Sequence, residues 1–143
     1  MESKLNCALL IDDDEATNTV NKMVINQLNC AKQVEVAQNG QEGLDFLKSA
    51  VEEKNPKPDL VFLDIMMPGM DGWEFLDEFY KFDKAQLGQM VVVMLTTSID
   101  PKDKEKALKV PYIDRFQTKP LTKPVLKDII EHHIPAAKIS NND

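Results

Sequence analysis

The stretch "PDLVFLDIMMPGMDG", residues 58–72, joins an apolar run to a segment that breaks regular structure. The run 60–63 ends at Asp64, and Pro68 and Gly69 follow shortly afterwards. A short apolar run bounded by turn residues predicts a buried strand. A carboxylate at the end of such a strand is costly to bury without a partner. Asp64 is therefore either a turn residue or a reactive group mounted on a rigid strand end.

The rest of the chain repeats this alternation of apolar runs and segments with helical periodicity. We predict strands at 7–11, 34–37, 60–64, 90–96 and 112–118, and helices at 15–28, 40–53, 101–108, after Asp71 and after Thr122. Strands that alternate with helices predict a parallel sheet covered on both faces, that is, a doubly wound α/β fold. The β-branched run 90–96 is the best candidate for a central strand.

Local signals predict where several helices begin and which side faces inward. Asp14, Asp71, Asp100 and Thr122 stand at expected N-cap positions, and Pro101 suits the first position of a helix. In the segment 15–28, helical periodicity predicts an inward face made by Ala16, Val20, Met23, Val24 and Leu28.

Composition narrows the class of protein. The chain has 143 residues, 43% of them hydrophobic, which fits one domain over 1–143 with a core at about 5–133 and a polar tail at 134–143. The formal charge of −7 argues against a nucleic-acid partner, which requires basic surface. The N-terminal apolar run is too short for a signal peptide or a membrane span. We expect a cytoplasmic protein with no membrane partner, in which Cys7 and Cys30 are reduced.

Polar residues lie at the ends of four of the predicted strands. Asp12–Asp14 follow the first strand, Asp64 ends the third, Thr96 ends the fourth, and Lys119 follows the fifth. The carboxyl ends of parallel strands meet at one edge of a sheet, so these groups should converge. Carboxylates that lie close together favour a bound cation, and an all-oxygen ligand set favours Mg²⁺. A metal beside a carboxylate, a hydroxyl and a lysine suits phosphoryl transfer, with Asp64 as the best-placed nucleophile.

These residues also carry a resemblance to a known family. The segments "LLIDDDE" (9–15), "VFLDIMMPGMDG" (61–72), "VVMLTTS" (92–98) and "TKPL" (118–121) occur in the order and spacing of the receiver domain of two-component response regulators. The chain resembles the single-domain, chemotaxis-regulator-like members of that family. The resemblance implies a flavodoxin-like fold with strand order 2-1-3-4-5.

The resemblance also implies roles for individual residues. Asp64 would accept a phosphoryl group from a phosphohistidine on a sensor histidine kinase or a histidine phosphotransfer protein. Mg²⁺ would be held by Asp12, Asp13, Asp64 and the backbone carbonyl of Met66.

Further implied roles concern the change of state. Thr96 would bind the phosphoryl group and move with it, Lys119 would pair with it, and the Lys119–Pro120 peptide bond would be cis. Phe116 takes the place of the aromatic switch residue. The face formed by the fourth helix, fifth strand and fifth helix would then bind an unidentified downstream protein, with the chain a monomer or a phosphorylation-dependent dimer. Such a chain is a signalling module rather than an enzyme.

Two alternatives remain open. A degenerate receiver would act as a binding scaffold without phosphorylation. An aspartate-nucleophile phosphatase of the haloacid dehalogenase kind would use Asp12 and Asp14, but Ala16 occupies the last position of that signature. The chain also departs from the usual receiver pattern at two positions. Phe116 has no hydroxyl, so any inward rotation of its ring would be driven by packing alone. Met66 cannot position water by hydrogen bonding, so we expect that hydrolysis of the phosphorylated form is not fast.

Overall fold

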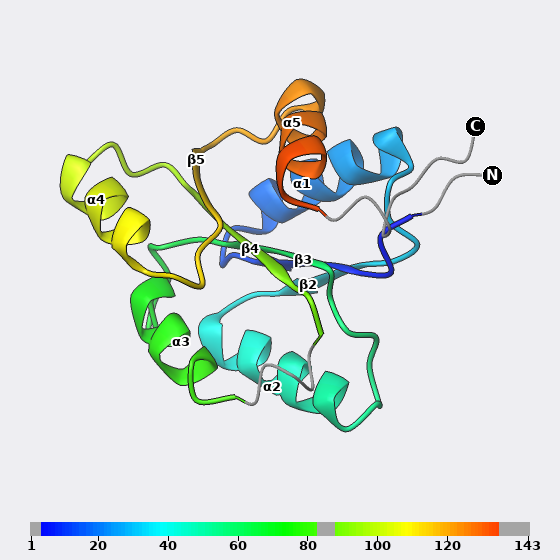
Figure 1. Cartoon of the computed structure of the whole chain (residues 1–143), viewed down its shortest axis with the longest axis horizontal. Helices are drawn as coiled ribbons and strands as arrows, with labels where there is room; N and C mark the ends of the chain where they lie inside the picture. Colours follow the sequence, from blue (N-terminus) through cyan, green and yellow to red (C-terminus); the bar gives the residue numbers. More distant parts are fainter. Residues whose placement is uncertain (1–3, 83–87, 135–143) are drawn as a thin grey trace.

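A computed structural model describes residues 4–82 and 88–134 of the chain. In chain order the elements are β1 (Ala8–Ile11), α1 (Glu15–Leu28), β2 (Val34–Ala37), α2 (Gly40–Val51), β3 (Leu60–Leu63), α3 (Gly72–Phe79), β4 (Val91–Thr96), α4 (Pro101–Lys109), β5 (Arg115–Thr118) and α5 (Lys123–His133) (Figure 1). The predicted polar tail lies outside the described residues, apart from Ile134, which is buried.

The five strands form one parallel sheet in the order β2-β1-β3-β4-β5. This confirms the predicted doubly wound, flavodoxin-like fold. The segment predicted as a central strand is β4, which is buried throughout and lies between β3 and β5, while the middle place belongs to β3. Two strand ends that carry acids, those of β1 and β3, are therefore neighbours in the sheet.

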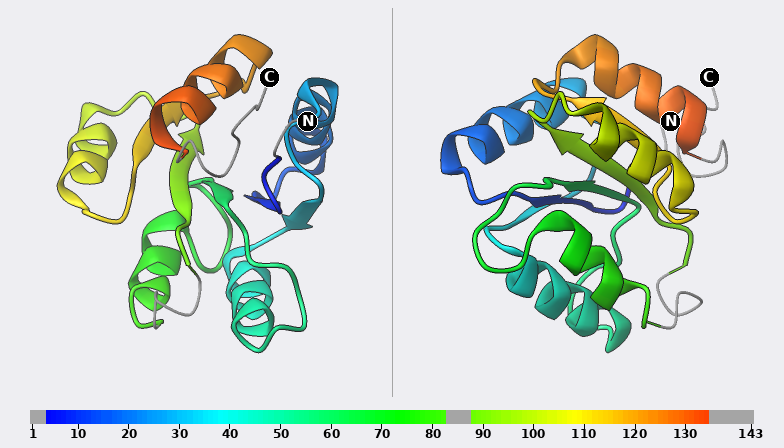
Figure 2. Two further views of the ribbon diagram at one scale, coloured as in Figure 1. Left: turned by 45° about the vertical axis from the view of Figure 1, so that its right-hand side comes forward. Right: turned by 90° about the vertical axis from the view of Figure 1, so that its left-hand side faces the viewer.

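Helices cover both faces of the sheet (Figure 2). Helices α1 and α5 lie on one face, α2 and α3 on the other, and α4 lies beside β5. Alternate strand residues point to opposite faces. Leu9, Ile11 and Leu63 accordingly join the apolar cluster under α2 and α3, whereas Leu10 and Phe62 join the cluster under α1 and α5. The sheet is thus buried on both sides, and its polar residues gather where the strands end.

The predicted inward face of α1 is wrong. Val20 and Met23 are 49% and 53% exposed, whereas Asn18, Asn21 and Ile25 are buried. Val24 and Leu28 pack against the core only partly. The pattern misled because α1 carries apolar residues on two sides, and periodicity alone does not show which side meets the sheet. Packing of Ile25 and a contact of Asn18 with the end of β1 decide the orientation.

The predicted caps have different outcomes. Asp71 forms a reciprocal capping box with Glu74, and Asp100 and Thr122 each accept a hydrogen bond from a backbone N–H of the helix that follows. Asp14 occupies the N-cap position of α1, but its side chain makes no capping bond and instead accepts a hydrogen bond from the Thr17 hydroxyl at 2.5 Å. Asp14 therefore stands at the predicted N-cap position but does not cap α1 through its side chain.

Two predicted elements are longer than the observed ones by more than one residue. Helix α2 ends at Val51 because Glu53 has a left-handed backbone with φ of 64°. Strand β5 begins only at Arg115, because Tyr112 lies in a turn where its ring packs against Phe79 and Tyr80.

Both cysteines are free, as predicted: Cys7 is buried and Cys30 is partly buried. Burial raises the pKa of the Cys7 thiol to about 12. In the described segments, no helix has the length and apolar composition that crossing a membrane requires.

Candidate functional site

The acids that follow β1 and β3 lie side by side. Ile11 pairs with Leu63 in the sheet, and the ladder continues one step further because Asp64 N donates to Ile11 O at 3.0 Å. Asp12 and Asp64 are only 4% and 6% exposed, whereas Asp13 is exposed. One carboxylate oxygen from each of the three lies within 4.8 Å of the others. The sheet thus brings together the acids that the sequence predicted at its edge.

Lys119, the residue after β5, reaches this cluster from the edge strand of the sheet, two strands away from β3. Its Nζ donates to Asp12 Oδ2 at 2.7 Å and to Asp64 Oδ2 at 3.3 Å, and its side chain is 13% exposed. The backbone fixes its position, since Lys119 N donates to Thr96 O at 2.8 Å. The Lys119–Pro120 peptide bond is cis. One ammonium is therefore shared between two buried carboxylates.

The pKa shifts follow from burial and from this shared charge. Burial raises the pKa of the Asp64 carboxyl, and the nearby Asp12 raises it further, while Lys119 lowers it; the net shift is upward. Burial alone would lower the pKa of Lys119, but the hydrogen bond to Asp12 and the charge of Asp64 outweigh it and raise that pKa. The lysine therefore stays charged. Its single positive charge offsets the repulsion between the two carboxylates only in part.

Three further predicted residues lie around the cluster. Thr96 is fully buried at the end of β4, and its Oγ1 accepts a hydrogen bond from Ser98 N at 3.1 Å. Within the described residues, no hydrogen bond joins Thr96 to Asp64. The Met66 side chain is 66% exposed, and its N–H lies 3.4 Å from Asp64 Oδ1. Phe116 is half-buried and packs against the apolar cluster under α2 and α3.

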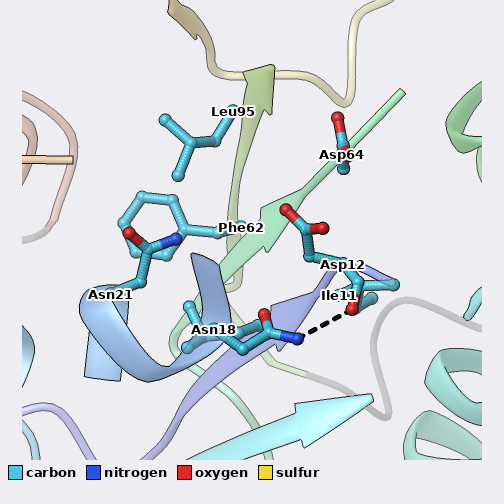
Figure 3. Close-up of a pocket in the computed structure, with 8 residues that line it drawn as sticks. Ile11, Asp12, Asn18, Asn21, Phe62, Asp64 and Leu95 are labelled. Carbon is cyan, nitrogen blue, oxygen red and sulfur yellow. Dashed lines mark hydrogen bonds between the residues drawn. The ribbon is translucent and has the colours of Figure 1, made fainter. Parts of the chain in front are cut away.

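Sequence reasoning missed two residues that support the site. A Cβ placed on Gly72 would lie 2.5 Å from the Asp64 carbonyl oxygen, so only glycine permits α3 to start so close to β3. A glycine directly after an expected cap was the available signal. Asn18 donates from Nδ2 to the Asp12 carbonyl oxygen at 2.8 Å (Figure 3). No local sequence pattern predicts the Asn18–Asp12 contact, because it depends on the orientation of α1 about its own axis.

The donor set fits a hard divalent cation. All three acids offer oxygen, which Mg²⁺ prefers, and the two buried carboxylates share a single ammonium that compensates them incompletely. Softer metals are less suited, because within the described chain no cysteine or histidine joins this group of possible ligands. Asp12, Asp13 and Asp64 are therefore a group of described residues that could hold such a cation.

Comparison with known proteins identifies the family. The model of the response regulator receiver domain matches residues 8–131, and the chain belongs to this family. It is 31% identical over 128 residues to the chemotaxis protein CheY of Halobacterium salinarum, covering 90% of this chain and 96% of that protein. A two component response regulator from Cytophaga hutchinsonii has a crystal structure that matches with a TM-score of 0.81 and 29% identity, over 90% of this chain and 96% of that one.

A receiver-like segment also occurs inside longer relatives. The chain is 29% identical over 121 residues to probable histidine kinase 2 of rice, Oryza sativa subsp. indica, covering 79% of this chain but 11% of that protein. It spans 7 to 45% of the length of seven longer curated relatives, this kinase included. The chain is thus a response regulator receiver domain of two-component signalling, a family of signalling switches that interact with histidine kinases.

Proposed function

We propose that this chain is a phospho-acceptor switch in which Asp64 receives a phosphoryl group from a phosphohistidine of a sensor histidine kinase or a histidine phosphotransfer protein. The observation that carries the proposal is the position of Lys119 Nζ, at 2.7 Å from Asp12 and 3.3 Å from Asp64, beside three mutually close carboxylates. Paired acids with one shared cation form a site that is suited to receive further positive charge and a charged phosphoryl group.

The proposed transfer is a single substitution at phosphorus. An oxygen of the Asp64 carboxylate forms the new O–P bond while the N–P bond of the donor breaks, and its electron pair returns to the imidazole ring. Asp12, Asp13, Asp64 and the Met66 carbonyl would hold Mg²⁺, which would supply charge neutralisation at the transferring oxygens. Lys119 stabilises the same negative charge through its ammonium, and the buried position of Asp64 limits the access of water.

The proposed output is a change at the face made by α4, β5 and α5. Thr96 would turn its hydroxyl from Ser98 N toward the phosphoryl group, and half-buried Phe116, one strand away, would repack. A protein target in the cytoplasm would distinguish the two states of this face by differential affinity. The chain would act as a monomer or as a dimer that forms on phosphorylation.

The exposed Met66 bears on the lifetime of the phosphorylated state. Its side chain is exposed, and its thioether offers only a weak acceptor for an attacking water. We therefore propose a phosphorylated form that hydrolyses slowly, with a faster rate expected for Met66→Asn.

The test is the intact mass of the full chain after incubation with acetyl phosphate, with and without Mg²⁺, beside an Asp64→Asn variant. A single phosphoryl adduct that needs Mg²⁺ and is missing in D64N would support the proposal. A chain that binds Mg²⁺ but gains no adduct would contradict it and favour the phosphorylation-independent scaffold. Steady release of phosphate from a generic ester would instead favour the phosphatase alternative.

A further inference from the structure

Helix α1 turns a polar face toward the sheet next to the acidic site. Asn18 and Asn21, one turn apart, are each 4% exposed, while the apolar Val20 and Met23 face outward. Only further along, at Ile25, does the inward face become apolar. A helix that packs on a sheet normally buries its apolar stripe. The orientation of α1 near the site therefore has a specific cause.

That cause is a contact between Asn18 and the backbone of Asp12. Nδ2 of Asn18 reaches back over the β1–α1 turn and donates to the Asp12 carbonyl oxygen at 2.8 Å (Figure 3). Asp12 is held at three further atoms: its N–H by the Ala37 carbonyl, Oδ1 by the Asp14 N–H and Oδ2 by Lys119. Of these four partners, Asn18 is the one that lies within α1.

The bond fixes more than the position of Asp12. The Asp12 carbonyl belongs to the planar peptide unit that joins Asp12 to Asp13. A partner on that oxygen therefore sets the tilt of the plane and, with it, the direction in which exposed Asp13 leaves the turn. Asp13 is one of the three acids whose oxygens lie within 4.8 Å of one another. The Asn18 amide thus bears on the spacing of the whole cluster.

The other end of the Asn18 amide is left without a partner. Its Oδ1 is buried and accepts no hydrogen bond from the described residues. The reverse orientation of the amide would place this oxygen against the Asp12 carbonyl, so the Nδ2 bond determines which way it points. Asn18 lines a narrow pocket together with Asp12, Asp64, Phe62 and Leu95 (Figure 3). A buried orphan acceptor destabilises a fold and calls for an explanation.

We infer that Asn18 is a positioning residue that orients the Asp12–Asp13 peptide, and so the paired acids, for a divalent cation. The inference rests on the proposed function, because it assumes that these acids bind Mg²⁺. It explains why position 18 holds an asparagine, although a leucine of similar shape would have no unpaired buried oxygen there. Partners behind metal ligands commonly affect metal affinity by an order of magnitude or more.

The experiment compares Asn18→Leu with Asn21→Leu, which changes a second buried asparagine of the same pocket that makes no hydrogen bond to Asp12 among the described residues. Calorimetric titration with Mg²⁺ gives the affinity, and thermal unfolding without Mg²⁺ gives the stability of each variant. For N18L we expect Mg²⁺ affinity about tenfold weaker than that of the unmodified chain. We also expect little change in the unfolding midpoint, because the variant removes the orphan Oδ1 but leaves the Asp12 carbonyl oxygen without the Asn18 donor. N21L should keep its Mg²⁺ affinity within about twofold, well short of the loss expected behind a metal ligand.

Three results would overturn the inference. Unchanged Mg²⁺ affinity in N18L would refute it while leaving the proposed function intact. Equal losses of affinity in N18L and N21L would assign both residues a merely structural role. Absence of Mg²⁺ binding in the unmodified chain would refute the proposed function and the inference together. Should N18L fail to fold, Asn18→Ala, which only removes atoms, carries the same comparison.

Discussion

Helices α1 and α3 occupy equivalent places, since each follows a strand that ends in a buried acid, yet their starts are fixed in different ways. Helix α3 begins with a reciprocal capping box between Asp71 and Glu74, and Gly72 lets it approach Asp64 closely. Helix α1 has no side-chain cap bond at Asp14 and is instead oriented by the Asn18 contact with Asp12 and by the packing of Ile25 against the sheet. One start is set by neighbouring residues and the other by the assembled fold.

The test with the largest expected effect removes the contact that Lys119, after the edge strand β5, makes with Asp12. Lys119→Met should lower the free energy of unfolding by about 3 kcal/mol without Mg²⁺, because it leaves Asp12 and Asp64 buried and uncompensated. Urea unfolding measures the loss, and added Mg²⁺ should restore part of it. If K119M proved as stable as the unmodified chain, the acids would not depend on this distant partner.

The second test addresses the start of α3. Gly72→Ala should lower the free energy of unfolding by about 2 kcal/mol, because its Cβ would overlap backbone atoms of Asp64 and Ile65 that cannot move aside easily. Gly69→Ala is the matched control: it meets open space and costs about 1 kcal/mol through its left-handed backbone alone. Urea unfolding of both variants measures the two losses of stability. If G72A lost no more stability than G69A, the close approach of Gly72 to the Asp64 backbone would not require a glycine.

The third test compares the two N-cap positions directly. Asp71→Ala removes the acceptor of the hydrogen bond that Glu74 N donates and should cost about 1 kcal/mol. Asp14→Ala removes a bond from the Thr17 hydroxyl at the surface but no side-chain capping bond, and should change stability little. Thermal unfolding of the two variants gives the loss of stability for each. If D14A lost as much stability as D71A, the starts of α1 and α3 would depend equally on their N-cap side chains.

The smallest effect is a pH dependence that comes from Asp64. Burial, more than any other cause, raises the pKa of Asp64 above its usual 3.8, so the folded chain binds this proton more tightly than the unfolded chain. The stability therefore falls as pH rises from the usual value through the raised one.

Asp64→Asn removes this titration. Without Mg²⁺, D64N should be more stable than the unmodified chain at neutral pH, and the difference should vanish as the pH falls below the usual carboxyl value. Urea unfolding over that range provides the measurement. A D64N variant that gains nothing at neutral pH would mean that Lys119 compensates Asp64 in full.

The sequence alone settled most of the fold and the identity of the acids. Apolar runs predicted the five strands, because a parallel strand buried on both faces appears in the sequence as a continuous apolar run whichever strands it pairs with. The residues that follow β1, β3 and β5 were predicted to lie at one edge of the sheet. The caps at Asp71, Asp100 and Thr122 were predicted correctly because capping acts within one helical turn. Asp14 had the same local signal but found another partner.

Only the tertiary structure decided how these pieces meet. It turned Asn18 and Asn21 inward in place of Val20 and Met23, because packing at Ile25 and the Asp12 carbonyl outweighed the apolar pattern of α1. It also brought Lys119 within 2.7 Å of Asp12, a residue 107 positions earlier in the chain. Sequence signals act over a turn or a strand, whereas these contacts depend on the sheet order and on the orientation of whole helices.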